Sequence, residues 1–82
     1  MKPNDLTKLV DSCLNDIVFD YNGKQCGITS AVHNYIPTFQ AWYGHKTKEY
    51  DNVQDVVTDK FYGDKSLLDL LCSSNPIKYA VL

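Results

Sequence analysis

The chain has 82 residues, of which 44% are hydrophobic, and its formal net charge is −2. This length and composition indicate one folded domain over residues 1–82 rather than a disordered chain. All eight basic residues are lysine. Arginine is the preferred residue for paired contacts to phosphate and guanine, so duplex nucleic acid is an unfavourable partner for this acidic chain.

The amino-terminal segment and the cysteines predict the compartment. The chain has no apolar run near the roughly 20 residues that span a bilayer, and residues 1–16 lack the apolar region of a signal peptide. We therefore expect a cytoplasmic protein with no membrane contact. The cysteines are odd in number and form no CxxC pair, which favours reduced, buried thiols over a disulfide framework or a zinc site. They are Cys13, Cys26 and Cys72.

Residues 4–17 have the periodicity of an amphipathic helix. Apolar side chains recur at spacings of three and four, which places them on one helical face. They are Leu6, Leu9, Val10, Cys13, Leu14 and Ile17. Asn4 or Asp5, just after Pro3, is the expected amino-terminal cap.

Residues 16–32 give the clearest local prediction, a β-hairpin. Two strand-like runs flank Asn22-Gly23, the pair preferred in a two-residue type I′ turn because both positions need a positive φ. This turn fixes a register in which Tyr21 faces Lys24, Phe19 faces Cys26 and Ile17 faces Ile28. The face that carries Ile17, Phe19, Cys26 and Ile28 is expected to lie under a helix.

The next segments extend the sheet. Residues 33–37 are predicted to be a connection in which Pro37 stops strand pairing. Residues 38–43 form a third strand, with Phe39, Ala41 and Tyr43 on the core face and Trp42 on the opposite face. A turn at Gly44 leads to a short fourth strand at residues 48–50.

The carboxy-terminal third is predicted to hold two short helices. The first covers residues 51–61 with Asp51 as its cap and Gln54 in the capping-box position. The second begins at Ser66, with Asp69 at its third position. Residues 76–82 alternate in polarity and form an edge strand or a docked tail. The fold class is therefore α+β: a two-layer sandwich with an N-terminal helix, an antiparallel three- to four-stranded meander sheet and two short helices on one face.

Four segments resemble a class of small uncharacterised α/β proteins from Gram-positive bacteria and their phages and mobile elements. They are FDYNGKQCGI (19–28), FQAWYG (39–44), KEYDNVQDVV (48–57) and GDKSLLDLL (63–71). These motifs are structural, namely a hairpin turn, a capped helix and a helix start. The resemblance implies a fold without an assigned activity, and no catalytic residue follows from it.

The sheet face away from the helices, together with the turn at residues 43–50, is the predicted binding surface. Aromatic and lysine side chains concentrate in residues 35–50, and an exposed apolar patch with a polar rim usually marks a protein interface. The predicted surface consists of Tyr35, Trp42, Tyr43, His45, Lys46, Lys48 and Tyr50. Trp42 is its centre; the competing interpretations are that Trp42 merely covers the sheet or that a homodimer buries it.

We therefore expect a small non-enzymatic protein-binding module. In its most concrete form it is an inhibitor, encoded by a phage or mobile element, that docks on a larger host protein such as a CRISPR-type defence nuclease. One alternative is a low-specificity binder of single-stranded nucleic acid, which stacks bases on Trp42 and Tyr43 with Lys24, Lys46 and Lys48 along the backbone. The other is a housekeeping homodimeric accessory protein, with residues 77–82 as a self-pairing edge.

Catalytic and metal-binding patterns are weak. Cys26 could pair with His33 or His45, but the hairpin register buries Cys26, and a buried thiol is inert. No ligand pair has zinc spacing, and we expect no cofactor. Asp55 and Asp59 are predicted to share a solvated helix face. The segment GDKS lacks the earlier glycine and the lysine of a phosphate-binding loop, so it is predicted to be a helix cap.

Overall fold

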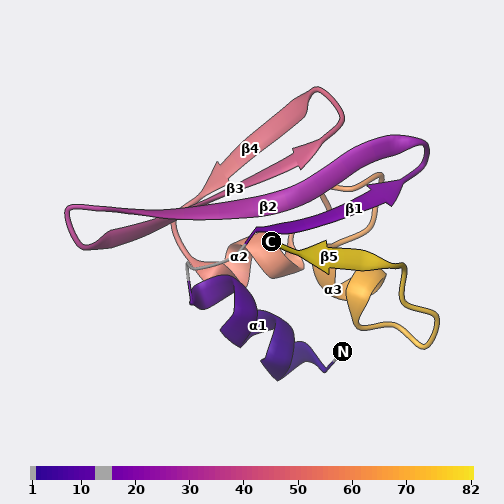
Figure 1. Cartoon of the computed structure of the whole chain (residues 1–82), viewed down its shortest axis with the longest axis horizontal. Helices are drawn as coiled ribbons and strands as arrows, with labels where there is room; N and C mark the ends of the chain where they lie inside the picture. The colour runs from indigo at the N-terminus through magenta and orange to yellow at the C-terminus, as the bar shows by residue number, and fades with distance from the viewer. Residues whose placement is uncertain (1, 13–15) are drawn as a thin grey trace.

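The computed structural model describes residues 2–12 and 16–82. Its elements, in chain order, are α1 (Pro3–Asp11), β1 (Ile17–Tyr21), β2 (Lys24–His33), β3 (Ile36–Tyr43), β4 (Lys46–Tyr50), α2 (Val53–Thr58), α3 (Leu67–Leu71) and β5 (Tyr79–Val81). The strands form one antiparallel sheet in the order β4-β3-β2-β1-β5, and the helices lie against one face of it (Figure 1). The predicted α+β fold is confirmed: β1 to β4 form the four-stranded meander, and β5 is the additional carboxy-terminal edge strand.

The first hairpin has the predicted register. Ile17 pairs with Ile28, Phe19 with Cys26, and the pair Tyr21–Lys24 closes the turn. Asn22 and Gly23 have φ values of 53° and 73°, as a type I′ turn requires. The face that was predicted to be apolar is buried at each of its four positions.

The core lies between the sheet and the helices. Strand positions that alternate toward the helices are buried, as predicted for Phe39, Ala41 and Tyr43. The helices contribute Leu6, Val10, Val56, Val57, Leu67, Leu70 and Leu71. Tyr62 lies at the centre: its ring contacts Phe19 at a centroid distance of 5.3 Å, and its hydroxyl donates to the Gly27 carbonyl at 2.9 Å. Because α2 and α3 have only six and five residues, this packing must stabilise them.

The helix ends differ from two of the predicted caps. In α1 the capping position is Lys2, which makes no side-chain cap bond, because Pro3 begins the helix and places Asn4 and Asp5 inside it. In α2 the cap is Asn52 and not Asp51, since the Asn52 side chain accepts from the Asp55 amide at 2.8 Å. The predicted capping box of Ser66 and Asp69 in α3 is confirmed.

The amino-terminal helix is also shorter than predicted. It ends at Asp11, and Ile17 belongs to β1 rather than to the helix. Cys13 and Leu14, which the periodicity assigned to the helical stripe, lie outside the described residues. The described part of the stripe is confirmed, since Leu6 and Val10 are buried and Leu9 packs against the core.

The prediction of a connection at residues 33–37 is wrong. Strand β2 continues to His33, Asn34-Tyr35 form a two-residue turn, and β3 begins at Ile36. Pro37 pairs with Val32. Ladder hydrogen bonds alternate along an antiparallel pair, so the second pair from a two-residue turn makes none. The missing N–H of Pro37 therefore points away from β2, and β4 pairs with β3 only from Phe39 onward.

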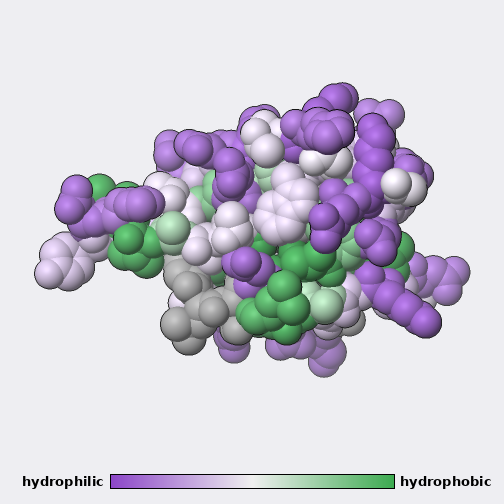
Figure 2. All heavy atoms as spheres, turned by 45° about the horizontal axis from the view of Figure 1, so that its top comes forward, coloured by the Kyte–Doolittle hydropathy of each residue, from purple (hydrophilic) through white to green (hydrophobic). Residues whose placement is uncertain are grey.

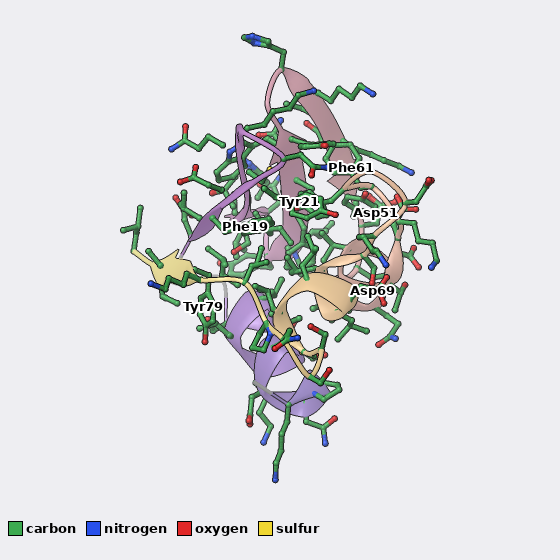
Figure 3. All side chains as sticks on the ribbon, turned by 90° about the vertical axis from the view of Figure 1, so that its right-hand side faces the viewer. Phe19, Tyr21, Asp51, Phe61, Asp69 and Tyr79 are labelled. Carbon is green, nitrogen blue, oxygen red and sulfur yellow. The ribbon has the colours of Figure 1, made fainter. Side chains whose placement is uncertain are left out.

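The carboxy-terminal segment is an edge strand, one of the two predicted alternatives. β5 pairs with β1, with Ala80 opposite Val18, and Asp16 and Leu82 exchange both backbone hydrogen bonds. Figure 3 shows Phe19 between the sheet and the helices, whereas Tyr79 lies at the outer side of the molecule on β5.

Candidate functional site

The seven residues of the predicted binding surface do not form one surface. Strand pairing places Lys46, Lys48 and Tyr50 opposite Tyr43, Ala41 and Phe39, hence on the helix-bearing face. The prediction of a lysine rim around Trp42 is therefore wrong. The residues divide among a hairpin tip (Tyr35), the open face (Trp42), a pocket at the far turns (Tyr43, His45 and Lys46) and a groove beside α2 (Lys48 and Tyr50).

Trp42 is on the open face, as predicted, where it covers Gly27. Trp42 in β3 pairs with Gly27 in β2. A Cβ atom built on Gly27 would lie 2.5 Å from the indole ring of Trp42. Gly27 therefore leaves the space into which Trp42 packs, and Trp42 is half-buried. Tyr43 faces the opposite side and is only 8% exposed, so Trp42 and Tyr43 cannot form the stacking platform predicted for single-stranded nucleic acid.

A groove beside α2 contains Lys48, Tyr50 and four carboxylates. The Asp59 carboxylate accepts from the Lys48 ammonium and from the Tyr50 hydroxyl, both at 2.7 Å. These bonds, that from Lys48 foremost, hold the pKa of Asp59 below its usual range, whereas burial raises the pKa of Tyr50. As predicted, Asp55 and Asp59 lie on the same side, where both line this groove; Asp59, which ends α2, is in addition ion-paired with Lys48.

The pocket at the far turns brings Tyr43, His45 and Lys46 together with Lys24. It lies where the turns at 22–23 and 44–45 meet and has a volume of about 440 Å³. Tyr43 accepts a hydrogen bond from the Asn22 amide at 3.0 Å, and the Lys24 ammonium lies 4.9 Å from the centroid of the Tyr43 ring. The residues concerned come from two hairpins that the register brings side by side.

At the opposite end of the sheet, the β2–β3 hairpin projects beyond the helices (Figure 1). We call residues 31–38 the arm. Strand β1 pairs with β2 only as far as Ile28, and β4 pairs with β3 only from Phe39, so within residues 2–12 and 16–82 no third strand pairs with the arm. Figure 2 shows hydrophobic side chains gathered on this projection. They belong to Val32 (56% exposed) and Ile36 (63% exposed).

Tyr35 at the tip of the arm has an unfavourable backbone conformation. Its φ is 67°, that of Asn34 is 52°, and its side chain is 98% exposed. A bulky residue with positive φ is uncommon. The sequence singled out Tyr35 but assigned it to the open face. Tyr35 and Trp42 are seven positions apart on an extended segment, a separation of about 23 Å.

Val32 and Ile36 were missed altogether. Two signals were available: Val32 extends the β-branched pattern of β2, and asparagine at position 34 tolerates positive φ. Tyr35 argued against a hairpin at this point of the sequence. Aromatic residues are rare in the second position of a two-residue hairpin turn, where φ is positive.

The prediction of buried thiols is confirmed for Cys26, whereas Cys72 is half-buried and Cys13 lies outside the described residues. Cys26 is buried on the core face, burial raises its pKa, and its Sγ donates to the Lys24 carbonyl at 3.4 Å. Burial also raises the pKa of Cys72. His33 is exposed at the end of β2, and His45 is exposed in the turn between β3 and β4. Within the described residues, no three His, Cys, Asp or Glu side chains gather in a way that could hold a metal ion.

No helix in the described part of the chain is long and apolar enough to cross a membrane. No family model, curated protein or solved structure matches this chain. The resemblance to proteins of Gram-positive bacteria and their phages therefore stays a prediction. Function is inferred below from the arm, the open face, the groove beside α2 and the pocket at the far turns.

Proposed function

We propose that this chain is a small non-enzymatic, cytoplasmic protein-binding module, and that its arm enters a cleft on a larger protein. The observation that carries the proposal is Tyr35, which is 98% exposed at the tip of the arm with a φ of 67°. Left-handed backbone costs an L-residue about 1–2 kcal/mol. A side chain that touches little of its own fold does not offset this cost within the monomer.

The first hairpin of the same chain provides the comparison. Its two-residue turn is Asn22-Gly23, with the glycine at the second position, where Tyr35 stands in the arm. Glycine adopts positive φ without steric strain. Strained residues gather at functional sites, so a tyrosine at this position favours a role outside the fold.

The side chains around Tyr35 are suited to a cleft. Val32 extends from the helix-bearing face of the arm and Ile36 from the open face, because β-strand side chains alternate. Both apolar side chains would be buried at the same time only if the arm were inserted into a cleft of the partner. The arm is about 10 Å long beyond the body of the sheet. Tyrosine is enriched among the residues that dominate binding energy, and its burial removes about 150–250 Å² from water.

The narrower form of the proposal is an inhibitor, encoded by a phage or mobile element of Gram-positive bacteria, that docks on a host protein such as a CRISPR-type defence nuclease. Two features support it. The chain is small, at 82 residues, and its arm can occupy a cleft of a larger protein without enclosing it. A purified defence nuclease whose cleavage is inhibited by the wild-type chain and not by an arm variant would support this form.

The test of the proposal is capture of a partner from the source cell. The bait is the tagged wild-type chain beside Tyr35→Gly, with Lys8→Gln on α1 as a matched surface control. We expect one larger protein to be retained by the wild type and by Lys8→Gln, and to fall at least about tenfold with Tyr35→Gly, as for a hot-spot residue. Equal retention by all three chains would remove the arm from the interface.

A second copy of the chain is the alternative partner, and one observation favours it. The edge strand β5 leaves Tyr79, Val81 and Leu82 exposed by 39%, 43% and 72%. Exposed apolar edges associate readily. Sedimentation at increasing protein concentration distinguishes the two: a dimer that Val81→Lys dissociates, while Tyr35→Gly leaves it intact, would favour the homodimer.

A further inference from the structure

The two turns that line the pocket, at residues 22–23 and 44–45, lie at the opposite end of the sheet from the arm (Figure 1). Its charged lining residues are Lys24 and Lys46, His45 lies beside them, and no acidic residue lines it among those the structure describes. The two ion pairs found in the described residues are Lys48–Asp59 and Lys60–Asp69, so neither Lys24 nor Lys46 has a carboxylate partner. In a chain of net charge −2, this pocket concentrates positive charge.

The exposed Lys24 side chain lies along the wall of the pocket, in contact with two of its residues. A Cβ on Gly44, whose φ is 60°, would lie 3.1 Å from the Cδ atom of Lys24, so the lysine stem occupies the space that the glycine leaves. The ammonium group lies 4.9 Å from the centroid of the Tyr43 ring. Tyr43 is itself fixed by burial and by the hydrogen bond from Asn22. A lysine with these contacts loses less conformational freedom when it binds an anion.

We propose that this pocket binds a phosphomonoester, the phosphate group of a small phosphorylated molecule. A phosphomonoester carries a charge of about −1.5 to −2 at pH 7, which the two ammonium groups balance; a carboxylate balances only one. Lysine binds phosphate as a point charge and does not need the planar geometry of arginine. A volume of about 440 Å³ lies within the range of ligand pockets, so the pocket has room for more than the phosphate itself.

This inference is independent of the proposed function, because the pocket shares no residue with the arm. It also differs from the interpretation of the chain as a nucleic-acid binder. Lys48, the third lysine of that hypothesis, is paired with Asp59 in the groove beside α2 and does not line this pocket. The remaining two lysines suit one compact dianion rather than an extended row of phosphodiesters.

The test is a titration of the ¹⁵N-labelled chain, followed by its amide chemical shifts. The probes are phenyl phosphate, benzoate and an eight-residue oligothymidylate, at constant ionic strength and pH 7.5. We expect phenyl phosphate to give saturable shifts confined to the amides of residues 23–25 and 43–46. Benzoate should bind at least about fivefold more weakly, because it presents one charge instead of nearly two.

Three variants and one control decide the assignment. Lys24→Gln and Lys46→Gln should each weaken phenyl phosphate by about fivefold or more. Lys8→Gln removes the same charge from α1 and should leave the affinity unchanged. Gly44→Ala should shift the Lys24 side chain slightly and weaken binding by less than Lys24→Gln does. Equal losses with Lys8→Gln, shifts spread over the whole surface, no saturable shift, or tighter binding of the oligonucleotide than of phenyl phosphate would each overturn the proposal.

Discussion

Replacement of Tyr35 by glycine should make the chain more stable, although it removes a large aromatic side chain. The side chain is 98% exposed, so its removal costs almost no packing. Relief of the left-handed backbone contributes about 1–2 kcal/mol, and the greater freedom of glycine in the unfolded chain offsets about 0.5–1 kcal/mol of it. The free energy of unfolding should therefore rise by about 0.5–1 kcal/mol, which corresponds to about 2–8 °C in Tm.

Urea unfolding, followed by the fluorescence of Trp42, measures this change, and two variants serve as controls. Tyr35→Ala keeps the Cβ atom and hence the strain, so its stability should stay within about 0.5 kcal/mol of the wild type. Gly23→Ala is the mirror experiment. Nothing lies within 4 Å of a Cβ at Gly23, so only the strain of its φ of 73° is added, and the chain should lose about 0.5–1 kcal/mol.

A loss of stability in Tyr35→Gly would contradict this expectation. If Tyr35→Gly lowered the free energy of unfolding by more than about 1 kcal/mol, the tyrosine ring would contribute to the fold of the monomer. The fold of the monomer would then account for the strained backbone at Tyr35. The strain would no longer indicate that the arm binds a partner. If Tyr35→Gly gains stability and loses partner capture, Tyr35 serves binding and not the fold of the monomer.

Three further predictions concern the open face, the core and the groove. Gly27→Ala should lose about 2–3 kcal/mol in urea unfolding, because the new Cβ would overlap Trp42 and a backbone carbonyl. Tyr62→Phe should lose about 1–1.5 kcal/mol in the same assay, because it removes the buried hydrogen bond from the Tyr62 hydroxyl to the Gly27 carbonyl. An unchanged urea midpoint would contradict a stabilising role of this hydrogen bond. Because the folded pKa of Asp59 is lowered, its contribution to stability is present above about pH 4 and is lost as the pH falls further. Asp59→Asn should therefore weaken the dependence of the free energy of unfolding on pH between pH 5 and 3. If this dependence is the same as in the wild type, the bond between Asp59 and Lys48 does not stabilise the fold.

Much of the fold could be predicted from the sequence because local signals agreed with the global arrangement. Asn22-Gly23 fixed one register, and the capping box at Ser66 fixed the start of α3. The arm could not be predicted, because Tyr35 opposes the backbone that it adopts. Pro37 added to the error: proline is tolerated in a strand where its nitrogen faces no partner, and that depends on the neighbouring strand.

The site was harder to predict than the fold, for the same reason. The side of the sheet on which Lys46 and Lys48 lie depends on the length of the turn at Gly44, and a change of one residue would exchange the two faces. The face of Trp42 was predicted correctly, but its partner was not. Glycine within a strand marks a close approach, and Gly27 gave that signal in the sequence.

The most direct test of the central claim is photo-crosslinking in the source cell. A photoreactive phenylalanine analogue is placed at position 35, and in a separate chain at position 8 on the exposed side of α1. We expect one discrete adduct with a larger protein from position 35 and none from position 8. The absence of an adduct from both positions, or the same adducts from both, would contradict the arm as a docking element.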